Sequence, residues 1–159
     1  MYKLERTALV PAPLHDVFEF FSDPNNLARI TPRSMGFKIT HIDELSIRPG
    51  FRIEYTVKPL LGGPVKWVTR IPVFDPPHRF VDIQERGPYR SWRHEHTFED
   101  LDGQTLMRDR VEYEMPLGPI GDLIQRLVVA RQLQEIFDYR TRKIGRLFAS
   151  SAAATPLGS

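Results

Sequence analysis

The sequence contains no cysteine among its 159 residues. Disulfide frameworks, thiolate metal sites, cysteine nucleophiles and redox-sensing thiols are therefore all excluded. It also has no apolar run approaching the roughly 18 residues that span a bilayer. The first residues, Met1 to Arg6, carry charges where a signal peptide needs its apolar stretch. We therefore expect a cytoplasmic protein without stable membrane insertion.

Excess charge of one sign is missing as well. Lys and Arg number 22 against 20 Asp and Glu, which leaves a net charge of +2. So small a charge does not require nucleic acid as a partner, and none is expected. The sequence also lacks a glycine-rich phosphate-binding motif, a hydrolase nucleophile elbow and a metalloprotease helix. The sequence therefore gives no motif that points to a nucleotide-binding or hydrolytic enzyme.

The remaining composition is that of one globular domain. Hydrophobic residues make up 41% and charged residues 26% of a chain whose length suits a single domain. No internal repeat and no linker divides it. We expect one domain over residues 1–148 and a flexible tail over residues 149–159, where small and polar residues prevail.

Two short helices are predicted near the N-terminus. Leu14, Val17, Phe18 and Phe21 recur at the spacing of one helical face. The helix should end at Asp23, because the residue before a proline avoids the helical region. A second short helix is expected over residues 25–30.

A long helix is predicted over residues 122–148, with a length of roughly 39 Å. Asp122 and Gln125 match the capping-box pattern of a helix N-terminus. Apolar residues such as Leu133 and Phe137 keep a helical spacing. The basic residues expected on the solvent side are Arg126, Arg131, Arg140, Arg142, Lys143 and Arg146.

The segment between these helical parts alternates with a period of two, as antiparallel strands do. With the first segment it predicts seven strands, over residues 2–10, 37–42, 51–58, 65–74, 79–85, 91–99 and 104–115. Such a sheet needs a cover on one face. We therefore predict an α+β fold in which the sheet curls around the long C-terminal helix, with the two short helices at one end and a cavity between.

Alternation also assigns the inward side chains. The inward face is clear for strands 91–99 and 104–115, because the other face of each is polar throughout. For strand 79–85 the inward face is ambiguous. The residues expected to bind a ligand in the cavity are Tyr55, Trp67, Thr69, Phe80, Asp82, Gln84, Trp92, His94, His96, Phe98, Asp109, Val111, Tyr113, Leu133 and Phe137. Polar groups within this set would each cost about 1–3 kcal/mol if buried without partners. A wet or ligand-filled cavity tolerates them.

Three interpretations of His94 and His96 compete. They could grip a metal, with Asp109 or Asp82 as third ligand. They could act as acid and base, with Asp109 orienting one of them. They could also serve only as hydrogen-bonding groups of the cavity. We favour the last, because two histidines on one strand are a weak metal signal; no metal and no cofactor is expected.

Several segments together resemble a known superfamily. The segment from Val17 to Leu27 with Ile30-Thr31-Pro32 resembles the helical part of START/Bet v 1-like (SRPBCC) proteins. The run from Trp67 to Ile71 and the motifs up to Trp92-Arg93-His94-Glu95-His96-Thr97-Phe98 are similar to its bacterial polyketide cyclase/dehydrase and lipid-transport branch. The motifs between those runs are Pro76-Pro77, Phe80-Val81-Asp82 and Gly87-Pro88-Tyr89. The resemblance implies a helix-grip fold and a cavity for a hydrophobic ligand; it carries no catalytic residue over.

The leading functional hypothesis is binding, with transport as an extension, of a small hydrophobic ligand such as a lipid, an isoprenoid or quinone, or a polyketide. The alternative is a polyketide-type cyclase or dehydratase with His94, His96 and Asp109 as its acid–base set. A second alternative is an interaction protein that uses the basic face of the last helix. The sequence leaves open whether the protein is an enzyme, and we favour a non-enzymatic role. It does not predict the oligomeric state.

Overall fold

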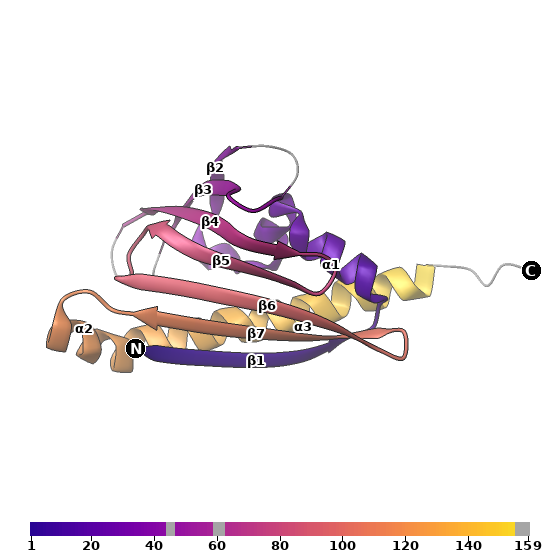
Figure 1. Cartoon of the computed structure of the whole chain (residues 1–159). Helices are drawn as coiled ribbons and strands as arrows, with labels where there is room; N and C mark the ends of the chain where they lie inside the picture. The colour runs from indigo at the N-terminus through magenta and orange to yellow at the C-terminus, as the bar shows by residue number, and fades with distance from the viewer. Residues whose placement is uncertain (44–46, 59–62, 155–159) are drawn as a thin grey trace, which may run out of the picture.

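A seven-stranded antiparallel sheet wraps one side of a long helix (Figure 1). The computed structural model describes residues 1–43, 47–58 and 63–154. The strands run in the spatial order β1-β7-β6-β5-β4-β3-β2, so the first and last strands pair. Their bounds are β1 Tyr2–Val10, β2 Lys38–Ile42, β3 Arg52–Val57, β4 Val65–Asp75, β5 Arg79–Arg86, β6 Ser91–Leu101 and β7 Gln104–Glu114.

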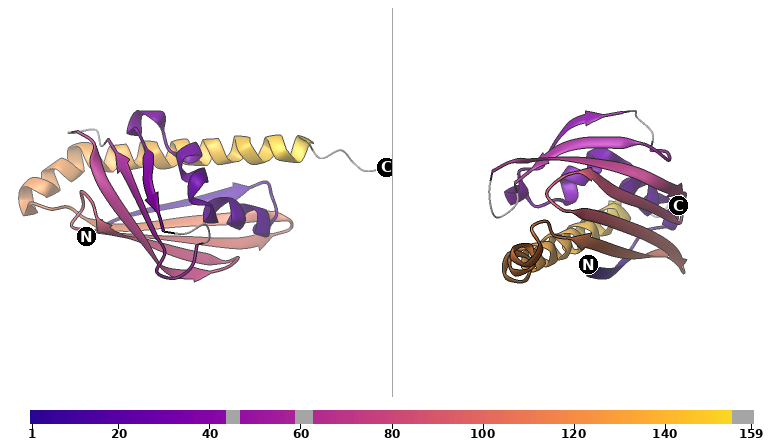
Figure 2. Two further views of the ribbon diagram at one scale, coloured as in Figure 1. Left: turned by 90° about the horizontal axis from the view of Figure 1, so that it is seen from above. Right: turned by 60° about the vertical axis from the view of Figure 1, so that its left-hand side comes forward.

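The helical segments lie on the concave side of this sheet. The helix α1 (Leu14–Ser22) and the short 3-10 segments η1 (Pro24–Ile30) and η2 (Arg33–Met35) connect β1 to β2. After β7 the chain forms α2 (Gly118–Ile124), a π-helical turn η3 (Gln125–Val129) and α3 (Ala130–Ala154). Figure 2 shows α3 running along the sheet, which curves around it, with α1 and η1 at one end. The predicted helix-grip α+β fold is therefore confirmed.

The long helix begins earlier than the sequence predicted. It starts at Gly118, after Leu117 in a left-handed conformation with φ of 70°. Pro119 suits the first turn, where a backbone N–H has no helical partner. The predicted capping box is wrong: Asp122 accepts a hydrogen bond from the Tyr2 hydroxyl, and Gln125 donates to the Tyr113 hydroxyl at 3.2 Å. Both side chains therefore bond to residues of the sheet and do not cap the helix.

The tail also differs from the prediction. The helix α3 continues to Ala154, beyond the predicted end at Phe148, because the alanines that follow have the highest helix propensity. The rest of the predicted tail, residues 155–159, lies outside the described residues.

The turn of the β6–β7 hairpin is shorter than predicted, because β6 continues to Leu101. It consists of Asp102 and Gly103, both with positive φ, as a type I′ hairpin turn requires. Within the described residues, no helix is both long and apolar enough to cross a membrane.

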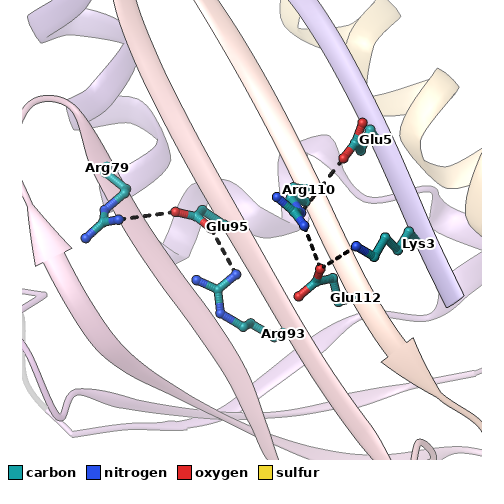
Figure 3. A network of polar contacts seen from close by, with 7 residues as sticks. All are labelled: Lys3, Glu5, Arg79, Arg93, Glu95, Arg110 and Glu112. Carbon is teal, nitrogen blue, oxygen red and sulfur yellow. Dashed lines mark hydrogen bonds and ion pairs between the residues drawn. The ribbon is translucent and has the colours of Figure 1, made fainter. Parts of the chain in front are cut away.

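Ion pairs within strands and between neighbouring strands lie on the outer face of the sheet (Figure 3). Glu95 lies between Arg79 and Arg93, at 3.3 and 2.9 Å. Glu112 binds Arg110 at 2.9 Å and Lys3 at 3.3 Å. Exposed pairs of this kind contribute only about 0–1 kcal/mol each. Their main consequence is that this face stays wet, so the apolar core forms on the concave face.

The core on the concave face forms around two positions of α3. Near the C-terminal part of α3, Ile144 joins Val17 and Phe18 of α1 and Met107 of β7 in one buried cluster. Nearer its start, Leu133 and Phe137 pack on Val111 and Tyr113 of β7. The helix is thus held to β7 at two separate places along its length.

We expect Ile144→Ala to lower the free energy of unfolding by about 2–5 kcal/mol, because it leaves a cavity in a fully packed cluster. Ile144 is 1% exposed. The matched control is Leu127→Ala in the same helical stretch, where the side chain is 68% exposed; it should change the stability by less than about 0.5 kcal/mol. Urea unfolding followed by circular dichroism measures both. Equal effects would contradict this account of the core.

Candidate functional site

A cavity of about 190 Å³ lies between the concave face of the sheet and α3. Residues of η1 and of the β5–β6 turn contribute to its wall. Ten of the residues predicted from the sequence line it: Tyr55, Trp67, Thr69, Phe80, Asp82, Trp92, His94, His96, Leu133 and Phe137. Alternation along the strands is the reason, since side chains two residues apart share the concave face. That these residues bind a ligand remains a prediction.

One wall of the cavity is aromatic. The rings of Tyr55 and Trp67 stack with centroids 5.9 Å apart, and Trp92 meets Trp67 edge to face at 5.4 Å. Tyr89 packs on Trp92 at 4.9 Å. The Tyr55 hydroxyl lies 3.1 Å from Thr69 Oγ1. Burial raises the pKa of both Tyr55 and Tyr89 above that of an ordinary phenol, so both hydroxyls stay neutral at physiological pH.

Polar groups of opposite charge gather on neighbouring strands at another part of the wall. Asp82 of β5 faces His94 and His96 of β6, and Asp109 of β7 lies beside the same two rings. His94 Nε2 is 2.9 Å from Asp109 Oδ1, and His96 Nε2 is 3.0 Å from Asp82 Oδ2. The two imidazole rings have centroids 3.7 Å apart, and Phe80 stacks on His96 at 4.1 Å. We call Asp82, His94, His96 and Asp109 the buried tetrad.

Each member of the buried tetrad perturbs the others. Burial alone would raise the pKa of Asp109, but its hydrogen bond with His94 and its close contact with the His96 ring outweigh burial and hold that pKa far below its usual range. Burial likewise opposes ionisation of Asp82, yet the charges of both histidines lower its pKa. Burial and the neighbouring His96 lower the pKa of His94. Burial also disfavours the charged His96, but its close contact with Asp109 and its hydrogen bond with Asp82 raise its pKa. The two carboxylates are therefore ionised, and His96 is the more basic imidazole.

Arg140 corrects a sequence prediction. It was expected on the solvent face of the long helix, but it lines the cavity with its guanidinium over the Phe137 ring, 5.1 Å from the ring centroid. Its charge also helps to lower the pKa of Asp82. The positions 133, 136, 137 and 140 form one helical stripe, so the spacing that identified Leu133 and Phe137 also contained the signal for Arg140.

Two donors in the cavity wall stand out. Among the described residues, neither the indole Nε1 of Trp67 nor the Nε of Arg140 has a hydrogen-bond partner, and both atoms are buried. Leaving a buried donor unpaired costs roughly 1–3 kcal/mol. Both residues line the same cavity. Two unpaired N–H donors therefore lie within the wall of the cavity.

Five predicted residues do not line the cavity. Asp109 lies behind the two histidines, Phe98 packs on Phe18 of α1, and Val111 and Tyr113 support Leu133 and Phe137 from below. Gln84 instead holds the β5–β6 turn. Its amide Nε2 donates to the Tyr89 carbonyl at 2.8 Å, and its Oε1 accepts from the Tyr89 N–H at 3.3 Å. These five residues contact the cavity wall or the core but do not line the cavity.

The residues that sequence reasoning missed come chiefly from outside the strands. Asn26, Leu27 and Thr31 of the η1 region line the cavity, as do Met35 and Tyr89. No periodic pattern marks such loop residues as inward. Gln132 of α3 also lines it and donates to Met35 Sδ at 3.5 Å, which joins the helix to the η2 segment. This contact arises only when the helix docks.

Comparison with known proteins gives one family and many similar folds. The sequence model of the family described as "Polyketide cyclase / dehydrase and lipid transport" matches residues 1–149. No curated protein matches the sequence. The structure of TTHA0849 from Thermus thermophilus is similar with a TM-score of 0.73 and 16% identity, covering 97% of this chain and 100% of that one.

Two further structures agree. Protein Ms6760 from Mycobacterium smegmatis has a TM-score of 0.69 and 22% identity, over 94% of this chain and 92% of that one. Ara h 8.0201 has a TM-score of 0.59 and 16% identity, over 90% of this chain and 97% of that one. At these identities the likeness concerns the fold alone. Together with the match to the family model, the shared fold confirms the resemblance to START/Bet v 1-like proteins that the sequence motifs indicated.

We expect Asp109→Asn to lower the stability at neutral pH by about 3–5 kcal/mol, because it removes one partner of buried charged groups. The gap between wild type and variant should narrow as the pH falls below about 4, the ordinary carboxyl pKa. Below this pH the Asp109 carboxylate binds a proton in the unfolded chain but not in the folded protein, where its pKa is lowered. Acid therefore favours the unfolded wild type and reduces the stability difference between wild type and variant.

Urea unfolding between neutral and acidic pH, in metal-free buffer, measures this gap. Asp43→Asn is the matched control, because Asp43 also faces a histidine, His41, at 3.6 Å, but both side chains are exposed. Asp43→Asn should leave the stability at neutral pH nearly unchanged, because exposed ion pairs contribute little. A gap that stays constant down to strongly acidic pH would contradict the assignment.

Proposed function

The chain belongs to the polyketide cyclase/dehydrase and lipid-transport family, whose model matches residues 1–149, and we propose that it binds a small hydrophobic ligand in the cavity under α3. The observation that carries the proposal is the pairing of an aromatic wall with the two unpartnered donors of Trp67 and Arg140. Ligand sites are typically apolar with a few placed polar groups. An apolar molecule with one acceptor atom matches both features.

The size of the cavity narrows the ligand class. Its volume of about 190 Å³ is below the roughly 300–1,000 Å³ of sites for drug-sized ligands. A long acyl chain needs more room than this. The flat walls of Tyr55, Trp67 and Trp92 favour a ring system, which offset or edge contacts stabilise. The proposed ligand is a flat cyclic molecule with a carbonyl or hydroxyl oxygen, as in quinones and aromatic polyketides.

The acceptor oxygen would pair with one of the two unpartnered donors. Trp67 Nε1 or Arg140 Nε would meet it, and Tyr55, which stacks on Trp67, would lie beside it at the first of these donors. The ring system would lie against Trp92 and Phe137. Burial of such a ring contributes about 25 cal/mol per Å² of apolar area, which outweighs a single hydrogen bond. Apolar area thus supplies most of the affinity, while the donors select among ligands. Transport, the finer form of this function, requires in addition that the ligand exchanges with an acceptor membrane or protein.

Binding can be followed directly, because the chain has two tryptophans and both line the cavity. We expect 1,4-naphthoquinone to quench their fluorescence saturably. The variant Trp67→Phe should weaken naphthoquinone binding by about 3–10-fold, as expected for one lost hydrogen bond. The binding of naphthalene, which has the same ring system without an acceptor, should change much less. In the variant, Trp92 remains as the reporter.

The control variant is Leu127→Ala, whose side chain is exposed on the long helix; it should bind both probes like the wild type. Native mass spectrometry of the freshly purified protein completes the test by identifying any co-purified hydrophobic molecule. Failure of the folded wild type to bind either probe, together with an adduct-free mass, would overturn the proposal. Equal losses for the two probes in Trp67→Phe would overturn the role of the indole N–H.

A further inference from the structure

Three members of the buried tetrad bring possible metal-ligand atoms together. Asp82, His94 and His96 each offer one such atom, and these atoms all lie within 4.8 Å of one another. Asp82 Oδ2 is 3.4 Å from His94 Nδ1 and 3.0 Å from His96 Nε2. The three side chains line the cavity, whereas Asp109 lies behind them. The sequence alone left the third ligand undecided between the two aspartates.

We propose that Asp82, His94 and His96 bind one divalent transition-metal ion at the cavity wall, and that Asp109 orients the two imidazoles. Two ligand atoms that each lie about 2.0–2.1 Å from a tetrahedral zinc ion are roughly 3.3 Å apart. The measured separations of 3.4 and 3.0 Å from Asp82 Oδ2 already match that spacing. Strand pairing sets it, because Asp82 lies directly opposite His94 in the β5–β6 ladder.

Asp109 has the position of the carboxylate that commonly supports a metal-binding histidine. Such a carboxylate accepts the ring N–H on the side away from the metal and thereby fixes the tautomer. His94 Nε2 is 2.9 Å from Asp109 Oδ1, which leaves Nδ1 of the same ring for the metal. His96 Nδ1 lies 2.9 Å from the same oxygen, though off the hydrogen-bonding direction, and this leaves its Nε2 on the side of Asp82. Asp109 thus holds the His94 ring by a hydrogen bond and contacts the far side of the His96 ring, so both rings have a nitrogen on the side of Asp82.

The charges also fit a divalent ion. Asp82 and Asp109 are two carboxylates in a largely buried environment, with side chains 18% and 3% exposed. With both imidazoles neutral, as metal binding requires, Arg140 supplies one positive charge near Asp82, and a divalent cation would offset the rest of the negative charge of the two carboxylates. Two imidazoles and one carboxylate suit zinc and iron(II), and leave at least one coordination position open. Because all three side chains line the cavity, an oxygen atom of a bound molecule or of water there would complete the coordination.

This inference goes beyond hydrophobic ligand binding and does not depend on it, since the test uses the metal alone. Chelator-treated protein is titrated with Zn²⁺ under equilibrium dialysis, and the bound zinc is measured by elemental analysis. We expect one saturable equivalent per chain. Co²⁺ in place of Zn²⁺ should give the visible absorption of a four- or five-coordinate site. Zinc should also raise the thermal unfolding temperature, because it binds the folded state.

Variants assign the site. Asp82→Asn and His94→Ala should lose the saturable equivalent, and Asp109→Asn should weaken zinc binding by about 10–100-fold, as substitutions behind a ligand do. The matched control is His41→Ala, since His41 and Asp43 form an exposed histidine–aspartate pair; it should keep the full equivalent. Near-ultraviolet circular dichroism identifies any variant that fails to fold.

A wild-type measurement keeps the proposal testable if the buried variants unfold. The chain has five histidines, and three of them, His15, His41 and His78, are exposed. Substitution of these three assigns the remaining ring ¹⁵N signals to His94 and His96. Zinc should shift the Nδ1 signal of one buried ring and the Nε2 signal of the other. Three results would each overturn the proposal: no saturable zinc in the folded wild type, an equivalent retained by the folded Asp82→Asn variant, or shifts confined to the exposed histidines. None of them bears on naphthoquinone binding by chelator-treated protein, so the two proposals fail separately.

Discussion

The structure depends on the ion pairs and hydrogen bonds that join Asp82, Asp109, His94 and His96 inside a largely apolar layer. An isolated buried carboxylate is strongly unfavourable, so each of these groups requires the others in place. The strand register provides this arrangement. His96 pairs with Phe80 on one side and with Asp109 on the other, and His94 pairs with Asp82. A shift of one residue would turn these side chains to the outer face. The tetrad therefore ties the register of β5, β6 and β7 to the integrity of the cavity wall.

The cavity follows from an incomplete closure between the sheet and α3. The helix packs tightly at Ile144 and again at Leu133 and Phe137, where it meets β7. The strands farther along the sheet, β3 and β4, present Tyr55 and Trp67, which stack on each other and line open space. A polar wall and an aromatic wall thus meet in one chamber, which is the arrangement expected of a site that orients an apolar molecule by its polar end.

Much of the inner surface could be predicted from the sequence because strands alternate strictly. His94 and His96 were placed inward since Arg93, Glu95 and Thr97 could only face water. Strand β5 was ambiguous for a physical reason: Val81, on the face opposite to Phe80 and Asp82, is also buried. The helix was harder. Its capping residues Asp122 and Gln125 found partners on β1 and β7, and Arg140 turned inward over Phe137. Local pattern cannot anticipate a partner that is distant in the sequence.

The sequence by itself determined the order and type of the elements, the concave-facing residues of β6 and β7, and the family, because hydrophobic periodicity and short motifs are local properties. Only the tertiary structure decided which aspartate stands beside which ring nitrogen, which residues of η1 and the β5–β6 turn complete the cavity, and which donors remain unpartnered in it. Those features arise from three strands and a helix meeting in space. Their geometry is set by ladder register and by the docking of α3, and neither is encoded in any single segment.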